Sequence, residues 1–484
     1  MNDSSSLKRI ARSATIIGGA NVIRVALGLA RNKTIALLLG PPGVAVFGLF
    51  SNLIAGAALI ATIGIDVSSV RSIARSLADN HRVHVTVRTL RLLCLIFGLI
   101  GAGIFWLARN QIALRFGVGL GVSGAEIGWL STAVFCSVAS ACYVALLAGL
   151  GRIRWLATVT TLSAFAWTAA AIIAVWRFGR AGIFLAAIAG PFATFVFSLY
   201  FVRHERPVGV SPTLIEYFRE SSKLLKLGWI IALTGVAASV SQLVARLLVQ
   251  TEIGQASAGY FQAAWAISVT FLGVASTALV TDFFPRISSA VSASRRNSVV
   301  LANQQLEVTL AVFVPAILAL VALAPFVIQL TYSNEFAPAA VQLRWQLQGD
   351  LIRSLTWPLG LYLLALGANG TYLLLEICWH LLYIALLWLS LKPLGLAAVG
   401  ISFAVSTGLY FIAELILLWV LVKFKLSRRS VVLLAMFFVF SGFSLYLAPW
   451  SLKLSTGVGL LGSVLLGAFS LLRLLPAVLS KGRT

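Results

Sequence analysis

Charged side chains lie inside the first long apolar stretch of the sequence, where a membrane-spanning helix is expected. Asn21, Arg24 and Arg31 are separated by three and seven residues, which places them on one face of an α-helix. A charged side chain at the bilayer centre costs about 2.5–3.5 kcal/mol on insertion scales, so it rarely faces lipid. The spacing therefore predicts a cationic stripe that faces a water-filled cavity and binds an anionic ligand.

Snorkelling is the alternative explanation, in which long side chains reach back to the lipid headgroups. It suits Arg31 and Lys33, which lie roughly 10–14 Å from Gly40 at a rise of 1.5 Å per residue. Arg24 lies roughly 24 Å from Gly40 and roughly 16 Å from Ser13 on the same rise. Arg24 is therefore the stronger ligand candidate, and both explanations stay open for Arg31.

Acidic residues and a histidine occur in later apolar stretches. Glu376 and His380 are four residues apart, Asp350 and Arg353 are three apart, and Glu414 stands alone. Carboxylates and histidines within a membrane can relay protons. Local pairing that neutralises charge explains them equally well, so ion coupling is one of two open interpretations.

Composition identifies the class of protein that positions these residues. The chain has 484 residues, of which 60% are hydrophobic and 11% charged, and its mean hydropathy is +0.98. These values exclude a soluble globular domain and predict an all-α polytopic membrane protein. The net charge of +23 is not accompanied by a soluble fold that could present it to a nucleic acid, so no nucleic-acid partner is expected.

Hydropathy predicts about fourteen membrane-spanning helices. They are placed near residues 14–39, 43–65, 87–108, 125–150, 155–176, 181–202, 228–250, 258–281, 307–331, 345–366, 371–391, 396–422, 431–449 and 457–476. Most of the 37 Lys and Arg residues then fall on the side that holds the N-terminus, which predicts that both termini are cytosolic. The longest connection, residues 203–227, has the pattern of an interfacial amphipathic helix.

Cysteine placement and the N-terminal sequence carry two further expectations. Cys94, Cys136, Cys142 and Cys378 all fall in hydrophobic runs, which favours small apolar core residues over disulfides or metal ligands. No metal site, cofactor or catalytic residue is expected. The N-terminal stretch lacks a cleavable-signal pattern and is expected to remain as a short cytosolic arm.

An internal repeat relates the two halves of the sequence. Residues 40–47 match residues 254–261, and Arg31 lies opposite Arg246 at nearly the same offset. Because six spans lie in each copy, the repeats are parallel. The sequence predicts a six-helix lobe at residues 1–204, a second at residues 205–426 and a central cavity. Residues 427–484 then form two extra helices and a cytosolic tail.

Two acidic and basic pairs recur at the cytosolic edge of the repeats. Asp66 and Arg71 lie at the corresponding place to Asp282 and Arg286. These residues are candidates for a gate, although anchoring of helix ends explains them as well.

The segment LLLGPPGVAVFGLF, followed by GIDVSSVRSIARSLAD, resembles the start of the Wzx-type polysaccharide flippases. These belong to the multidrug/oligosaccharidyl-lipid/polysaccharide exporter superfamily. The resemblance rests on Gly40, Pro41, Gly43, Gly64 and Arg71. It implies two six-helix bundles, alternating access and transfer of a polyprenyl-pyrophosphate-linked oligosaccharide from the cytosolic to the outer leaflet of the bacterial inner membrane.

The charged stripe suits such a substrate. Arginine offers forked donors and keeps its charge, so Arg24, Arg31 and Arg246 are candidate pyrophosphate ligands, with Asn21 and Lys33 beside them. Expected partners are the lipid-linked oligosaccharide, membrane lipids and other assembly proteins such as a polymerase. The alternatives are a drug or metabolite antiporter of the same superfamily and, less favoured, a membrane glycan polymerase or glycosyltransferase.

Overall fold

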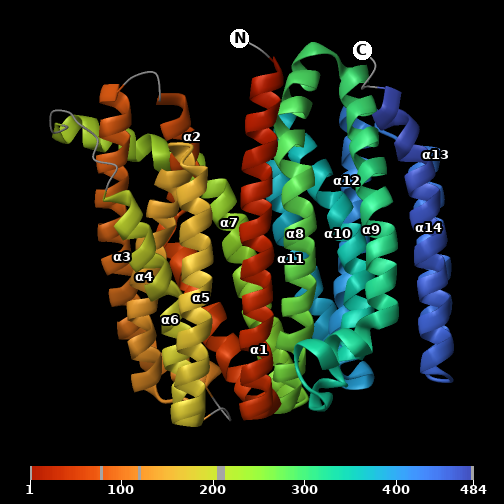
Figure 1. Ribbon diagram of the computed structural model, residues 1–484, viewed down its shortest axis with the longest axis horizontal. Coiled ribbons are helices and arrows are strands. Elements are labelled where there is room, and N and C mark those ends of the chain that lie inside the picture. The colour runs from red at the N-terminus through yellow and green to blue at the C-terminus, as the bar shows by residue number, and fades with distance from the viewer. Residues whose placement is uncertain (1–2, 77–79, 118–120, 204–212, 481–484) are drawn as a thin grey trace. The chain divides into compact units, whose positions relative to one another are not determined.

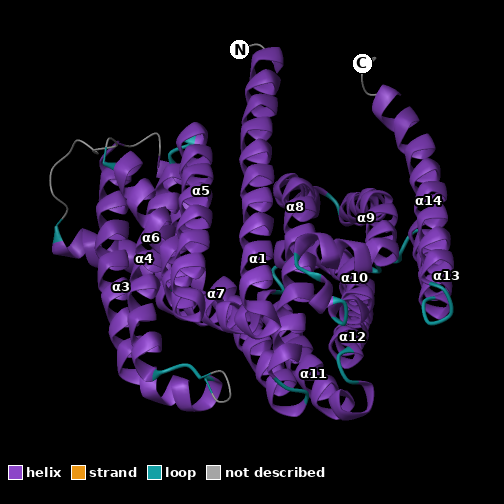
Figure 2. Ribbon diagram, turned by 60° about the horizontal axis from the view of Figure 1, so that its bottom comes forward, coloured by secondary structure: helices purple, strands orange, loops and turns teal. Residues whose placement is uncertain are grey.

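The described residues of the computed structural model are 3–76, 80–117, 121–203 and 213–480, and some side chains within these ranges also lie outside the description. Helices and turns account for these ranges, and no strand occurs in them (Figure 1 and Figure 2). The helices are α1 (Asp3–Thr62), α2 (Ile65–Ser76), α3 (Asn80–Phe116), α4 (Gly124–Gly149), α5 (Ile153–Phe178), α6 (Gly182–Val202), α7 (Leu214–Glu252), α8 (Gln255–Ala293), α9 (Arg295–Thr331), α10 (Ala339–Ala365), α11 (Asn369–Leu394), α12 (Ala397–Val422), α13 (Arg428–Leu447) and α14 (Leu452–Ser480). Short 3₁₀ turns lie at η1 (Gly179–Ala181) and η2 (Asn334–Phe336).

Ten helical stretches in the described residues are long and apolar enough to cross a membrane. Two of them, Gly18–Thr62 and Ile153–Val202, have 45 and 50 residues. Each is more than twice the length needed for a hydrocarbon core of about 30 Å, and each is divided by a break. Counted together with α8 and α10, and with each divided stretch taken as two spans, the described helices agree with the expected number of about fourteen spans. The chain is an all-α multi-pass membrane protein.

Glycine produces the breaks that separate the first elements. Gly40 has φ 61° and interrupts α1 just before Pro41 and Pro42, and Gly64 has φ 70° at the turn into α2. Gly254, the repeat equivalent of Gly40, has φ 110° before α8. Positive φ costs glycine least, which explains why glycine occupies both of these positions, which the predicted repeat aligns.

Several helices extend beyond the predicted spans, among them α3 and α7. The expected loop from Arg109 to Gly124 is helical as far as Phe116, because α3 continues past the predicted end. The expected interfacial helix is continuous with the next span in α7. Thr213 and Glu216 cap its start reciprocally, since the Thr213 amide donates to the Glu216 carboxylate and the Glu216 amide donates to the Thr213 hydroxyl.

The cysteine expectation is wrong for one pair. Cys94 in α3 and Cys142 in α4 form a disulfide, while Cys136 and Cys378 are free. The two bonded residues are 48 apart in sequence, and the extensive packing of α3 on α4 brings them together. Cys94 and Cys142 also lie in the hydrophobic core of the N-terminal unit, so they contribute apolar packing as well.

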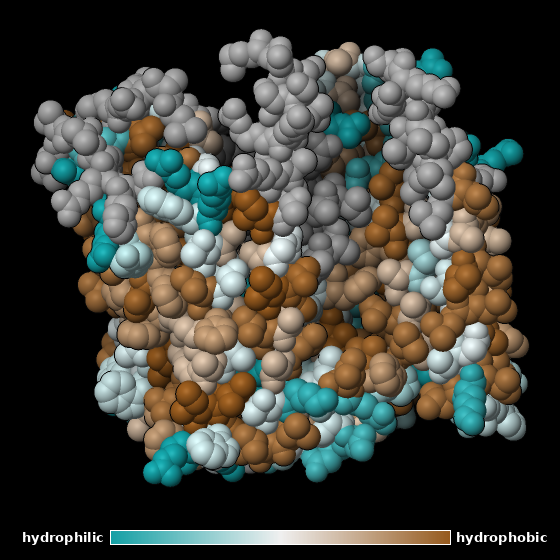
Figure 3. Space-filling model, viewed as in Figure 1, coloured by the Kyte–Doolittle hydropathy of each residue, from teal (hydrophilic) through white to brown (hydrophobic). Residues whose placement is uncertain are grey.

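The chain divides into two compact units, residues 1–247 and 248–484. In the first unit, α1 packs on α5, and α4 packs on both α3 and α6. In the second, α10 packs on α8, α9 and α12, and α14 packs on α9. The lobe boundaries near residues 204 and 426 remain predictions. Large apolar side chains such as Leu107, Trp176 and Val439 are exposed, as residues that contact lipid would be, and apolar residues predominate on the face shown in Figure 3.

Glycines let α10 and α12 approach closely. A Cβ atom on Gly349 would lie 2.8 Å from Phe403 Cε1 and 3.0 Å from the Cα atom of Ala404. A Cβ atom on Gly400 would lie 2.6 Å from the Cβ atom of Trp345. Small residues at a helix interface permit this spacing within a membrane.

Replacement of Gly400 by alanine is expected to force α10 and α12 apart. Overpacking typically costs about 1–3 kcal/mol, so the Gly400→Ala variant should have a lower Tm in detergent, measured by tryptophan fluorescence. Gly457→Ala is the matched control, because a Cβ atom there would meet nothing within 4 Å. An unchanged Tm for Gly400→Ala would contradict the close approach.

Candidate functional site in the membrane-spanning helices

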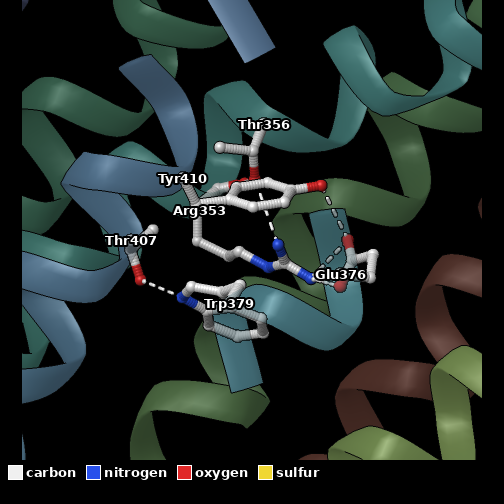
Figure 4. A network of polar contacts seen from close by, with 6 residues as sticks. All are labelled: Arg353, Thr356, Glu376, Trp379, Thr407 and Tyr410. Carbon is white, nitrogen blue, oxygen red and sulfur yellow. Dashed lines mark hydrogen bonds and ion pairs between the residues drawn. The ribbon is translucent and has the colours of Figure 1, made fainter. Parts of the chain in front are cut away.

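A buried ion pair joins α10 to α11. One Arg353 nitrogen, Nη2, donates to both carboxylate oxygens of Glu376, at 3.1 Å and 3.0 Å (Figure 4). The side chains of the pair are only 13% and 4% exposed. Charge-assisted hydrogen bonds of this kind offset the cost of removing both groups from water.

Aromatic rings lie on both sides of the Arg353 guanidinium (Figure 4). Its carbon Cζ is 4.1 Å from the ring centroid of Trp379 and 5.4 Å from that of Tyr410. The Tyr410 hydroxyl donates to Glu376 Oε1 at 3.0 Å, and Trp379 Nε1 donates to the Thr407 hydroxyl at 3.2 Å. Stacking and hydrogen bonds together fix the guanidinium in one position.

Glu414 adds a second carboxylate to this cluster. It lies one helical turn after Tyr410 in α12, is fully buried, and receives no hydrogen bond on either oxygen. A Cβ atom on Gly360 of α10 would lie 3.6 Å from Glu414 Oε1 and 2.8 Å from the Tyr372 ring. The cluster of Arg353, Glu376, Tyr372, Tyr410 and Glu414, called the C-terminal polar cluster below, therefore draws on α10, α11 and α12.

The pairs expected within single helices are not those that form. Arg353 bonds to Glu376 of the next helix, whereas both oxygens of Asp350 lack a hydrogen bond, with Ser268 beside them. His380 is buried against the Trp379 ring, with the centroids 4.4 Å apart. Charge neutralisation occurs between helices, where spacing along one helix cannot reveal it.

The stripe of α1 divides into a covered part and an open part. Arg31 is 9% exposed, with Cζ only 3.5 Å from the Trp167 ring centroid and 5.6 Å from that of Phe47. Trp167 is itself held by a hydrogen bond from Nε1 to the Ala186 carbonyl, at 2.8 Å. Arg24 lies about two turns earlier on the same face and is exposed, so the two arginines have different surroundings.

The remaining predicted residues are dispersed. Asn21, Lys33 and Asp66 are partly buried, and Arg246 of α7 is 1% exposed. Arg286 is exposed on α8. The side chains of Arg71 and Asp282 lie outside the described part of the structure, so the predicted gate pairs stay predictions.

Two kinds of site residue were missed from the sequence. Tyr410 and Tyr372 each lie four residues before a buried carboxylate, and this aromatic–acid spacing could have indicated them. The other is Arg344, which precedes the span predicted at 345–366 but is buried in α10. Its Nε donates to the Val321 carbonyl at 3.2 Å, four residues before Pro325, whose missing N–H leaves that carbonyl free.

Comparisons with known proteins agree with this architecture. The chain is similar over most of its length to an inward-facing multidrug resistance MATE family transporter of the MOP superfamily, with a TM-score of 0.72, 17% identity and coverage of 83% of this chain and 98% of that one. It is also similar to the lipid II flippase MurJ in its inward closed conformation, with a TM-score of 0.66, 12% identity and coverage of 95% and 100%. A MOP superfamily transporter from Pyrococcus furiosus gives a TM-score of 0.62 at 18% identity, with coverage of 85% and 95%.

At these identities the likeness concerns the fold. No curated relative matches the chain. A family model for polysaccharide biosynthesis proteins matches residues 10–291, which is more than half of the sequence. The chain belongs to the polysaccharide biosynthesis protein family.

Proposed function

We propose that the protein is a flippase that moves a polyprenyl-pyrophosphate-linked oligosaccharide from the cytosolic to the outer leaflet for surface polysaccharide synthesis. Family membership and the fold shared with a lipid II flippase support this assignment. The observation that carries it is the exposure of Arg24 in a membrane-spanning part of α1. A guanidinium at this depth has water and an anion as its favourable neighbours, because lipid gives it no partner.

Arg24 is therefore proposed as the first ligand of the pyrophosphate, with Asn21 beside it on the same face. Arg31 is already stacked on Trp167, so its proposed part is to add positive potential from a fixed position. Lys33 and Arg246 contribute charge in the same way. Guanidinium groups suit a pyrophosphate because their planar forks match its oxygens.

Transport is proposed to proceed by alternating access coupled to an ion. Asp350 and His380, together with the C-terminal polar cluster, are the proposed coupling groups. Asp66, Arg71, Asp282 and Arg286 are proposed to gate the cytosolic side. The proposed location is the bacterial inner membrane with both termini cytosolic, where a polysaccharide polymerase would receive the product.

A drug or metabolite antiporter is the second candidate. The similarity to a multidrug transporter fold favours it. The basic character of the first span argues for an anionic substrate instead, since a site for cationic drugs would present carboxylates.

Purified protein in liposomes should move a lipid-linked oligosaccharide between leaflets without changing its mass. Accessibility of the glycan to an external lectin measures the movement, and mass spectrometry measures the product. A longer glycan would identify a polymerase, and export of cationic dyes without glycan movement would favour the antiporter.

Arg24→Ala should reduce glycan export by ~10- to 100-fold, since a hydrogen bond to a charged group contributes about 1.5–3 kcal/mol. Arg24→Lys should retain part of the activity, because lysine keeps the positive charge but lacks the planar, forked N–H donors of the guanidinium. Complementation of a flippase-deficient strain measures export, with membrane abundance determined in parallel. Arg177→Ala is the control and should export nearly normally, because Arg177 is exposed in the last turn of α5 and has no proposed part in binding. Normal export by Arg24→Ala at normal abundance would contradict the role of Arg24 as the main pyrophosphate ligand.

Thiol labelling should establish the orientation. In a variant without free cysteines, Lys453→Cys should react with an impermeant maleimide in sealed cells, whereas Ser292→Cys should react only after permeabilisation. Both positions are exposed, so access by the reagent depends on the side of the membrane. Labelling of Ser292→Cys in sealed cells would invert the proposed topology.

A further inference from the structure

We propose that Glu414 holds an exchangeable proton, and that Arg353 is the fixed counter-ion that keeps Glu376 ionised. This assignment names the proton as the coupling ion of the proposed flippase. The transport experiment below therefore rests on the proposed function. The site itself can be tested without any transport.

The first argument is the balance of charge. The C-terminal polar cluster contains two carboxyl groups, Glu376 and Glu414, and one guanidinium, Arg353. Burial of an ionised carboxylate without a partner costs several kcal/mol in a low-dielectric interior. With one cation for two acids, one carboxyl group is neutral.

Hydrogen-bond donors decide which of the two is neutral. Glu376 accepts three hydrogen bonds, two from Arg353 Nη2 and one from the Tyr410 hydroxyl. Tyr410 also lies within reach of Glu414, but its single proton is directed to Glu376. Glu414 has no hydrogen-bond donor on either oxygen, so its ionised form would be left without stabilisation in this interior.

The neighbours of Glu414 on every packed helix agree with this assignment. From α10, Arg353 is the nearby cation, and it forms its ion pair with Glu376. From α11, Tyr372 and Glu376 face it, while His380 packs on Trp379. From α12 itself, only Tyr410 adds a polar group, so no second cation is present in this part of the described structure to pair with an ionised Glu414.

A route for proton exchange follows from the same contacts. Tyr410 lies between the two carboxyl groups, so rotation of its hydroxyl toward Glu414 would give the ionised form of Glu414 a donor. Loss of the proton from Glu414 and redirection of the Tyr410 hydroxyl are thereby linked. The glycine contacts hold α10 and α12 close together. A change in their separation would alter both the proton on Glu414 and the direction of the Tyr410 hydroxyl.

Infrared difference spectroscopy of the purified protein tests the proton directly. The carbonyl band of a protonated carboxyl group, which shifts in D₂O, should be lost in Glu414→Gln. Asp350→Asn is the matched control, because Asp350 of α10 is likewise a buried acid with no hydrogen bond on either oxygen, and it should leave the Glu414 band in place. In Arg353→Met a second band should appear, since Glu376 loses its counter-ion. A spectrum of Glu414→Gln identical to the wild type would overturn the assignment.

A transport assay in proteoliposomes tests whether the proton drives the movement. A pH gradient without sodium should drive glycan movement by the wild type, and Glu414→Gln should lose the response to the gradient. Movement driven by a sodium gradient and not by a pH gradient would overturn proton coupling. A wild type that moves no lipid-linked oligosaccharide would instead contradict the proposed function, and the spectra would still decide the state of Glu414.

Discussion

The cost of placing charge in a low-dielectric interior governs the arrangement of the C-terminal unit. Arg353 and Glu376 lie in membrane-spanning helices, and each would be expensive alone. Their direct contact, the two flanking aromatic rings and the Tyr410 hydroxyl together satisfy the pair. Because these groups come from three helices, the ion pair also specifies how α10, α11 and α12 pack. Removal of one partner would leave an uncompensated charge, so the helices and the pair depend on each other.

The fold was largely predictable from the sequence, because hydrophobic length is a strong signal in membrane proteins. Even α10, with Asp350 and Arg353 inside it, was predicted at 345–366 and found at Ala339–Ala365. Gly40 and Gly254 lie between predicted spans, and the helices break at both. Extension of α3 to Phe116 and continuity of α7 were missed, because helices can extend beyond the hydrocarbon core where hydropathy no longer identifies them.

The site was predictable only as a set of residues. Sequence spacing detects pairs on one helix, and it suggested Asp350 with Arg353 and Glu376 with His380. The observed pair of Arg353 with Glu376 depends on which faces of α10 and α11 meet, and so does the Cys94–Cys142 disulfide between α3 and α4. Contacts between helices carry little signal in a single sequence. The separation of Arg24 from Arg31 likewise depends on where Trp167 of α5 lies.

The contact between Arg344 and the Val321 carbonyl has a mechanical consequence. Pro325 weakens α9 at this turn, and a weakened helix bends easily unless the freed carbonyl finds a donor. That donor belongs to α10, so the shape of α9 is set by a neighbouring helix. α14 is attached to α9 close by, since Thr456 donates to the Ala322 carbonyl. A displacement of α10 would therefore be transmitted through α9 to α14, and these three helices would move together.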